Sequence, residues 1–308
     1  MWVARLVTKR LFYAAISLAI LALTVMIFSR ISGDPAMMLL GPDASPEDLT
    51  AMRSKLGLDQ PFVMQYLYYI GNAVRGDFGQ SIYYNESTLS LYLQRLPASL
   101  LLASVAFAWS VALGVGAGIL SAVSRNRMLN GTVSLFALTG MAVPPFWVGL
   151  VLIMYLSVDK QWLPSSGSGT WQHLVMPALS LGWYFAASNM RLTRSAMLEV
   201  MDSDFVRLAR LKGIPEWRVV LRHALPGALI PVITLSAINL VLMINAAVVI
   251  ETVFAWPGVG RLLYDGISYR DMPLIQAVVL ISGAMVVVVS LLLDFLYVLI
   301  DPRIRHAE

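Results

Sequence analysis

Residues 224–250 read ALPGALIPVITLSAINLVLMINAAVVI and include no Asp, Glu, Lys or Arg. About 20 such residues in a helix span the hydrocarbon core of a bilayer, so this stretch alone predicts a transmembrane helix. Other stretches of similar length are equally free of charge, and the first of them is bracketed by Lys9, Arg10 and Arg30. These other charge-free stretches are residues 11–29, 96–124, 128–158, 161–190 and 272–293. Six spans are therefore expected.

The composition of the chain also favours a membrane protein. Of its 308 residues, 58% are hydrophobic and 13% are charged, whereas about 25% are charged in a typical soluble domain. The chain has no cysteine, which excludes disulfides and thiolate metal sites. Its formal net charge of +4 implies no nucleic-acid partner, because membrane topology can account for it.

The distribution of basic residues predicts the orientation. With the N-terminus inside, the inner segments carry most of the Lys and Arg residues, as the positive-inside rule requires. Both termini are therefore expected in the cytoplasm. The expected segments are 1–30 (cytoplasmic N-terminus and first span), 31–96 (extracytoplasmic helical insertion), 97–123, 129–157 and 174–192 (second to fourth spans), 193–226 (cytoplasmic loop), 227–251 (fifth span), 252–273 (extracytoplasmic loop), 274–299 (sixth span) and 300–308 (cytoplasmic C-terminus).

The long outer connection carries its own helix signals. Ser45 is a suitable N-cap for a helix over 46–56, with Asp48 three residues after the cap and Gly57 as the stop. A second helix is expected over 61–76. This second helix either lies on the outer bilayer surface or packs on the spans.

The long inner connection, 193–226, predicts two helices and a sharp turn. Asp204 opens the first helical pattern and basic residues up to Lys212 end it, which suits the helix dipole. Gly213 permits a left-handed cap, and Pro215 begins the second helix. The spacing leaves two interpretations open: a solvated basic loop that faces the lipid headgroups, or a structure that docks into a partner.

The same segment resembles the cytoplasmic coupling loop of ABC-importer permeases. The resemblance is carried by Arg207-Leu208-Ala209-Arg210-Leu211-Lys212-Gly213, followed by His223-Ala224-Leu225-Pro226. In the general family pattern, Glu and Ala stand where this chain has Arg207 and Leu208. The arginine form is similar to the peptide branch of the family.

Further motifs along the chain resemble the dipeptide, oligopeptide, glutathione and nickel permeases, and the long outer segment is similar to their first, or B-type, subunit. These motifs are Gly33-Asp34-Pro35, Leu56-Gly57-Leu58-Asp59-Gln60-Pro61, Gly76-Asp77-Phe78-Gly79, Glu251-Thr252-Val253-Phe254, Trp256-Pro257-Gly258-Val259-Gly260-Arg261 and Asp301-Pro302-Arg303-Ile304-Arg305. One such motif alone is weak, whereas the ordered set is specific.

The resemblance implies an all-α permease of the type I kind in a bacterial plasma (inner) membrane. Its implied partners are a sister permease in a heterodimer, two cytoplasmic ATPase subunits, an extracytoplasmic solute-binding protein and the lipid bilayer. No cofactor is expected on this chain, and ATP and Mg are expected on the ATPases. The residues expected to couple to an ATPase are Asp204, Arg207, Ala209, Arg210, Lys212, Gly213, Ile214, Pro215 and Glu216.

Polar residues in the spans are candidates for the translocation path. Asn239 and Asn245 either line the path or hydrogen-bond between helices. Glu251 either meets the ammonium group of a peptide or pairs with Arg261 or Arg270. Two further patterns concern helix shape. The glycines at 114, 116 and 118 favour close helix packing, and Pro144-Pro145 predicts a kink in the third span.

Other functions fit the sequence less well. The chain has no phosphate-binding Gly-x-x-x-x-Gly-Lys-Ser/Thr loop, so it is not expected to hydrolyse ATP itself. A membrane hydrolase is disfavoured because the segment 165–169 does not fit Gly-x-Ser-x-Gly, and the three histidines have no metal-binding spacing. A stand-alone secondary transporter or channel remains the alternative, although such proteins usually place ionisable residues near the midplane.

Overall fold

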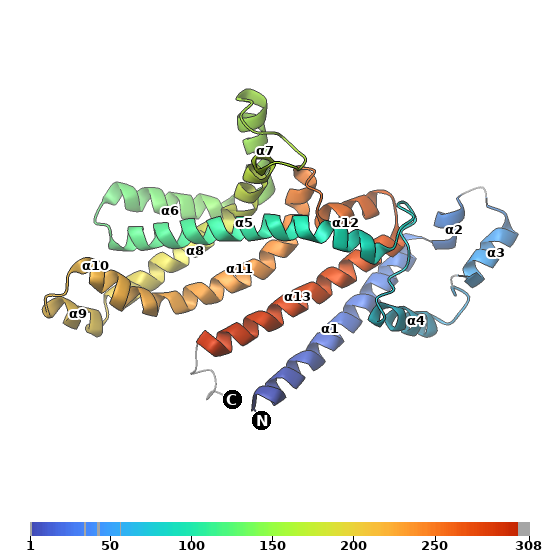
Figure 1. Ribbon diagram of the computed structural model, residues 1–308, viewed down its shortest axis with the longest axis horizontal. Coiled ribbons are helices and arrows are strands. Elements are labelled where there is room, and N and C mark those ends of the chain that lie inside the picture. Colours follow the sequence, from blue (N-terminus) through green and yellow to red (C-terminus); the bar gives the residue numbers. More distant parts are fainter. Residues whose placement is uncertain (1, 34, 42–43, 56, 301–308) are drawn as a thin grey trace. The chain divides into compact units, whose positions relative to one another are not determined.

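The computed structural model describes residues 2–33, 35–41, 44–55 and 57–300 (Figure 1). Within these ranges the chain is helical, and its only β-pairing is an isolated bridge between Gln80 and Ser87. The all-α class predicted from the sequence is therefore confirmed. Asp34, Leu56 and residues 301–308, which include the last motif and nearly all of the expected C-terminal segment, lie outside the described residues.

The helices belong to two compact units. The first unit comprises residues 1–97 and 258–291, and the second comprises 98–257 and 292–308. The first contains α1 (Trp2–Ser32), α2 (Pro35–Leu40), α3 (Pro46–Lys55), α4 (Phe62–Val74), the start of α5 (Thr88–Val123), α12 (Val259–Ser268) and most of α13 (Met272–Ile300). The second contains the rest of α5, then α6 (Arg127–Ala142), α7 (Pro145–Leu152), the π-helix η1 (Ile153–Asp159), α8 (Trp171–Met201), α9 (Asp204–Leu211), α10 (Glu216–Arg218), the π-helix η2 (Val219–Ala224) and α11 (Leu225–Val253).

Local signals explain the short helices of the first unit. The Ser45 hydroxyl accepts a hydrogen bond from the Asp48 amide at 3.1 Å and donates to the Asp48 carboxylate at 2.8 Å, so the cap predicted for α3 is present. In α4, the Tyr66 hydroxyl donates to the Ala19 carbonyl of α1 at 2.7 Å, which holds α4 against that helix. The helices predicted over 46–56 and 61–76 are therefore confirmed as Pro46–Lys55 and Phe62–Val74.

A buried carboxylate organises the other end of this unit. Asp271 is 1% exposed and accepts hydrogen bonds from the Ser81 hydroxyl at 2.5 Å and the Tyr83 amide at 3.0 Å. It also accepts from the Leu274 amide at 3.1 Å and so caps the start of α13. The Tyr83 ring stacks on Tyr269, with 3.7 Å between their centroids. Asp271 thus joins the loop before α5 to the turn between α12 and α13.

The second unit is built around α8, which packs against α6, α7 and α11. A small residue also lets α8 approach α5, since a Cβ at Gly182 of α8 would lie 2.5 Å from the indole nitrogen of Trp109 in α5. The apolar core includes Leu102 of α5, Phe185 of α8 and Phe254 after α11, all of which are buried. α8 is therefore enclosed by protein along most of its length.

Four described helices are long and apolar enough to cross a membrane, namely Thr8–Ile31, Thr88–Val123, Glu216–Val253 and Met272–Leu293. A fifth candidate is the pair Arg127–Ala142 and Pro145–Asp159, which is bent by 106°. This bend confirms the kink predicted at Pro144-Pro145. Proline causes it because proline lacks an amide donor and disfavours a helical conformation of the residue before it.

The predicted fourth span, 174–192, lies inside α8, which is not among the helices that pass as spans by length and composition. A physical reason is that the buried residues of α8 include polar and small ones, such as Ser180, Gly182 and Asn189, which lower its mean hydropathy. The number of six spans therefore stays a prediction.

Candidate functional site

The α9–α10 hairpin (residues 204–218) turns sharply at Gly213. The Gly213 amide donates to the Arg210 carbonyl at 3.0 Å, and the Ile214 amide donates to the Ala209 carbonyl at 3.3 Å. This pair of bonds is the Schellman motif, which needs a left-handed residue after the helix. Gly213 has a φ of +74° and meets this need without the strain that a side chain would add.

The inner face of the hairpin packs onto the second unit. Val206 and Ala209 of α9 are buried together with Val219 and Val220, and this cluster includes Met197 near the end of α8. The hairpin is therefore a packed extension of α8 and α11.

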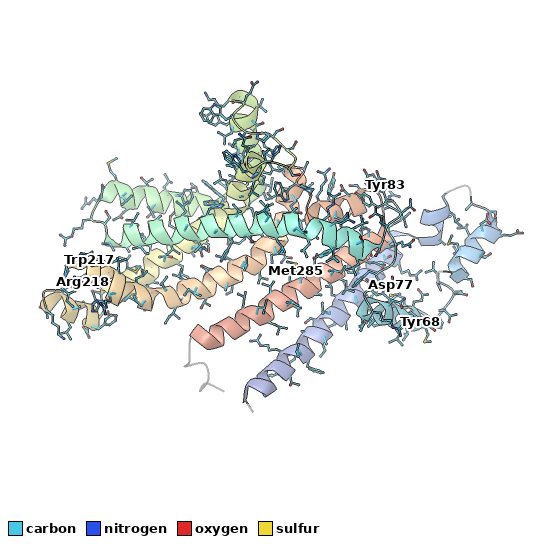
Figure 2. The ribbon with its side chains drawn as sticks, in the orientation of Figure 1. Tyr68, Asp77, Tyr83, Trp217, Arg218 and Met285 are labelled. Carbon is cyan, nitrogen blue, oxygen red and sulfur yellow. The ribbon has the colours of Figure 1, made fainter. Side chains whose placement is uncertain are left out.

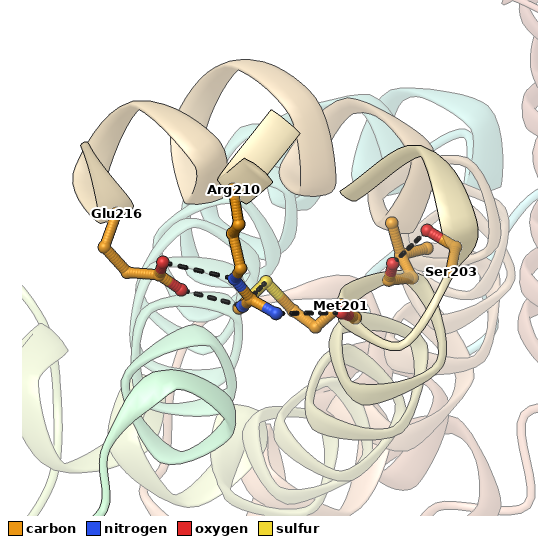
Figure 3. A network of polar contacts seen from close by, with 5 residues as sticks. Met201, Ser203, Arg210 and Glu216 are labelled. Carbon is orange, nitrogen blue, oxygen red and sulfur yellow. Dashed lines mark hydrogen bonds and ion pairs between the residues drawn. The ribbon is translucent and has the colours of Figure 1, made fainter. Parts of the chain in front are cut away.

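An ion pair closes the hairpin across its turn (Figure 3). Arg210 Nη2 lies 2.8 Å from Glu216 Oε1, and Arg210 Nε lies 3.2 Å from Oε2, so the pair is bidentate. The guanidinium also reaches the Met201 carbonyl at the end of α8, at 3.5 Å. The hydrogen bond from Arg210 holds the pKa of Glu216 below its usual value and raises the pKa of Arg210.

The outer face of the hairpin is apolar and uncovered in this chain. Phe205, Leu208 and Leu211 recur every third residue on α9 and are 52%, 52% and 85% exposed. Trp217 of α10 is 60% exposed, and the Arg218 guanidinium lies 5.0 Å from the centre of its ring (Figure 2). Exposed apolar side chains in such a group mark an interaction site.

The expected coupling residues divide between the two faces. Arg207 lies at the exposed surface, where it pairs with Asp202 at 2.8 Å and approaches Asp204 at 3.9 Å. Lys212 and Pro215 are exposed, whereas Ala209 points into the unit. The expected coupling residues thus lie on one hairpin. Most of them are at its surface, whereas Ala209 packs in the buried cluster under it.

The two asparagines expected in the path have different surroundings. Asn239 is 2% exposed, and its amide donates to Asn189 Oδ1 of α8 at 3.1 Å, an oxygen that also accepts from Ser236 at 3.3 Å. Asn245 is exposed, and its amide bonds only weakly to the Val241 carbonyl of its own helix, at 3.4 Å. Asn239 therefore joins α8 to α11, whereas Asn245 presents its side chain outward.

Glu251 is enclosed near the end of α11. It is 1% exposed, and the Ser99 hydroxyl of α5 donates to its Oε1 at 2.5 Å. Arg261 pairs with Asp265 at 3.1 Å. The pairing of Glu251 with Arg261 or Arg270 considered from the sequence stays a prediction. Glu251 and Ser99 are thus a buried polar contact between two helices of the second unit.

Sequence reasoning missed the apolar face of the hairpin and the polar partners Asn189 and Ser99. The three-residue spacing of Phe205, Leu208 and Leu211 in a basic segment could have revealed the apolar face. No local pattern reveals Asn189 or Ser99, because each meets its partner from a distant part of the chain. In the described ranges, no group of three or more His, Cys, Asp or Glu side chains could hold a metal ion.

Comparisons with known proteins match nearly the whole chain to membrane components of transport systems. Residues 114–306 match the family described as binding-protein-dependent transport system inner membrane component, and residues 3–103 match the N-terminal part of such components. Over 301 residues the chain is 39% identical to the glutathione transport system permease protein GsiC of Escherichia coli K12, which covers 97% of this chain and 98% of that protein. The GsiC protein of Shigella dysenteriae serotype 1 matches to the same extent.

Solved structures support the fold. The methionine ABC transporter MetNI, in an inward-facing conformation, aligns with a TM-score of 0.57 and 20% identity over 68% of this chain and 96% of that one. An amino acid ABC transporter aligns with a TM-score of 0.56 and 16% identity, over 68% and 93% of the two chains. Given these matches, the chain belongs to the inner membrane components of binding-protein-dependent transport systems, the permease subunits of ATP-driven importers.

Proposed function

We propose that this chain pairs with a sister permease and forms half of the translocation path for dipeptides, oligopeptides or a related small solute such as glutathione. The substrate class is supported by the glutathione permeases to which the chain is 39% identical over nearly its full length. An uptake assay in which unlabelled dipeptides compete with labelled glutathione tests this substrate class.

The complete importer proposed contains the two permeases, two cytoplasmic ATPase subunits that bind ATP and Mg, and an extracytoplasmic binding protein. This chain would cross the membrane six times, with both termini in the cytoplasm. The excess of basic residues in segments such as 193–226 supports this orientation. The insertion 31–96 would then lie outside, where the binding protein docks.

The α9–α10 hairpin is the proposed contact with the ATPase. The observation that carries this proposal is the exposed row of Phe205, Leu208 and Leu211 beside the Gly213 turn. Burial of one large apolar side chain contributes about 1.5–3 kcal/mol, so a partner that covers this row gains substantial binding energy. The basic and polar residues of the hairpin border the row and would set the orientation of the partner.

The residues considered for the path take different proposed roles. Asn245 is the proposed path-lining residue, because its side chain is exposed on the C-terminal third of α11. Asn239 is proposed as a contact between helices, which its bond to Asn189 supports. Glu251 is proposed to hold α5 and α11 together through Ser99.

Gly213→Val tests the coupling role. The new Cβ would meet no atom within 4 Å, so the change strains the backbone at φ +74° without a clash inside the chain. A left-handed residue with a side chain costs roughly 1–2 kcal/mol. We expect the complete transporter in liposomes to lose most of the substrate transported per ATP hydrolysed, as measured by parallel uptake and phosphate-release assays.

Gly57→Val is the matched control. Gly57 also ends a helix at positive φ, +65°, with no atom within 4 Å of an added Cβ, but it lies in the outer insertion. The control variant should keep the wild-type ratio of uptake to hydrolysis. Normal coupling in Gly213→Val, or an equal loss in Gly57→Val, would show that the hairpin turn has no special part in coupling.

A further inference from the structure

An open groove runs between α6 and α8 in the second unit. Its volume is about 560 Å³, which is within the range of about 300–1,000 Å³ that small-molecule sites occupy. At one point the helices approach closely, since a Cβ added to Gly140 of α6 would lie 2.5 Å from the Ala187 Cβ of α8. Away from this contact the groove opens toward the C-terminal part of α8.

The floor and walls of the groove are apolar. Val133 and Ala137 of α6 and Met190 of α8 form its floor, and all three are buried. Leu138 on one side is 70% exposed, and Leu198 on the other is 45% exposed. A hydrocarbon chain laid along this floor would contact both helices and cover these leucines.

The rim at the C-terminal part of α8 is basic. Arg191 and Arg194 line the groove there, together with Ser134 and Ser195. In the described part of the chain neither arginine has an acidic partner, although Arg194 Nη1 approaches the Ser134 hydroxyl at 3.5 Å. Two guanidinium groups therefore share one end of an apolar groove with no carboxylate to balance them.

The Nε atom of Arg194 lacks an acceptor among the residues that the structure describes, although Nη1 of the same guanidinium reaches Ser134. Arg194 Nε is buried, and no oxygen in the described residues accepts its proton. A buried donor without a partner costs about 1–3 kcal/mol, and an acceptor from outside the chain that reached this guanidinium after a small side-chain movement would remove that cost. Phosphate oxygens suit the site, because a guanidinium binds phosphate through two parallel N–H bonds.

We infer that this groove binds an anionic phospholipid, whose phosphate lies between Arg191 and Arg194 while one acyl chain follows the floor formed by Val133, Ala137 and Met190. The arginines lie on the last turns of α8 before the hairpin, which is the side proposed above to face the cytoplasm. Basic pockets between helices on that side of a membrane bind anionic headgroups. The inference needs the membrane assignment but neither the proposed substrate nor the coupling role.

Native mass spectrometry of the complete transporter, titrated with phosphatidylglycerol or phosphatidylcholine, tests the site. Two basic residues favour an anionic lipid by about 30-fold in affinity. We expect the wild-type complex to prefer phosphatidylglycerol by about this factor, and Arg191→Gln/Arg194→Gln to lose the preference. Ser195→Trp keeps both charges but fills the groove, so it should also lose tight binding of phosphatidylglycerol.

Arg125→Gln/Arg127→Gln is the matched control, since it removes the same charge from exposed residues at the start of α6 and just before it, and it should keep the preference. If this control lost the preference for phosphatidylglycerol equally, the preference would come from general surface charge, and the proposed site would be wrong. Tight binding of free glycerol phosphate would show that the ligand of the groove is a soluble anion and not a lipid. Unchanged lipid binding in both groove variants, or loss of the sister permease from Arg191→Gln/Arg194→Gln, would also contradict the inference.

Discussion

At the scale of single residues, Arg210 and Glu216 illustrate how a surface ion pair acquires a structural role. Each has a side chain that is partly exposed, 39% for Arg210 and 52% for Glu216. Solvent screening therefore limits their direct contribution to stability to about 1 kcal/mol or less. Their value lies in geometry, because the bidentate contact spans the Gly213 turn and sets the angle between α9 and α10.

The pair should show a defined pH dependence. Because the folded pKa of Glu216 is lowered, its contribution is fully present above the unfolded value of about 4.3 and is lost as the pH falls through the folded pKa. A double-mutant cycle with Arg210→Gln and Glu216→Gln, read by thermal unfolding in detergent, should give a coupling of about 0.5 kcal/mol at pH 7. High salt should reduce it, and a coupling that persists below the folded pKa would contradict the assignment.

At the scale of helices, the small residues of α5 separate into two groups that the sequence does not distinguish. A Cβ on Gly114 would lie 2.7 Å from the Ala186 carbonyl oxygen, and one on Gly118 would lie 2.7 Å from the Thr193 Cβ. Gly116 has no atom within 4 Å of an added Cβ. The packing face of α5 is therefore a Gly-x-x-x-Gly pair against α8, and Gly116 points away from it.

Substitution by alanine should have opposite effects at these positions. Gly114→Ala forces α8 away and should destabilise the protein by about 1–3 kcal/mol. Gly116→Ala meets only open space and should stabilise it by up to about 1 kcal/mol, because alanine favours the helix. Thermal unfolding of the two variants in detergent measures both effects. Equal destabilisation by the two changes would mean that the helices pack through a different face.

At the scale of the whole molecule, the number of membrane spans decides on which side of the membrane each connection lies. Four helices pass as spans, and the bent pair of α6 with α7 and η1 is a fifth candidate. α8 would be the remaining span of the predicted six, with its polar residues directed into protein rather than lipid. This topology would place the hairpin and the outer insertion on opposite sides of the membrane.

The absence of cysteine from the sequence makes this topology directly testable. Glu47→Cys and Lys212→Cys each introduce one exposed thiol, the first in the insertion and the second in the hairpin. A membrane-impermeant maleimide should label Glu47→Cys in spheroplasts and Lys212→Cys only in inverted vesicles. Labelling of both variants from the same side would refute the proposed topology.

The sequence by itself determined the features that depend on short stretches of chain. Helical periodicity, the Ser45 cap, the Gly213 turn and the break at Pro144-Pro145 follow from backbone preferences that act within a few residues. The apolar runs likewise predicted a membrane protein, because the length of a span depends on the bilayer thickness and not on tertiary contacts.

Only the tertiary structure decided which side chains meet across helices. It paired Asn239 with Asn189, enclosed Glu251 beside Ser99, and turned Gly114 but not Gly116 toward α8. It also opened the groove beside Arg194. Each of these depends on the rotation and separation of two helices far apart in the chain, and packing of the whole unit sets those quantities, so no local pattern encodes them.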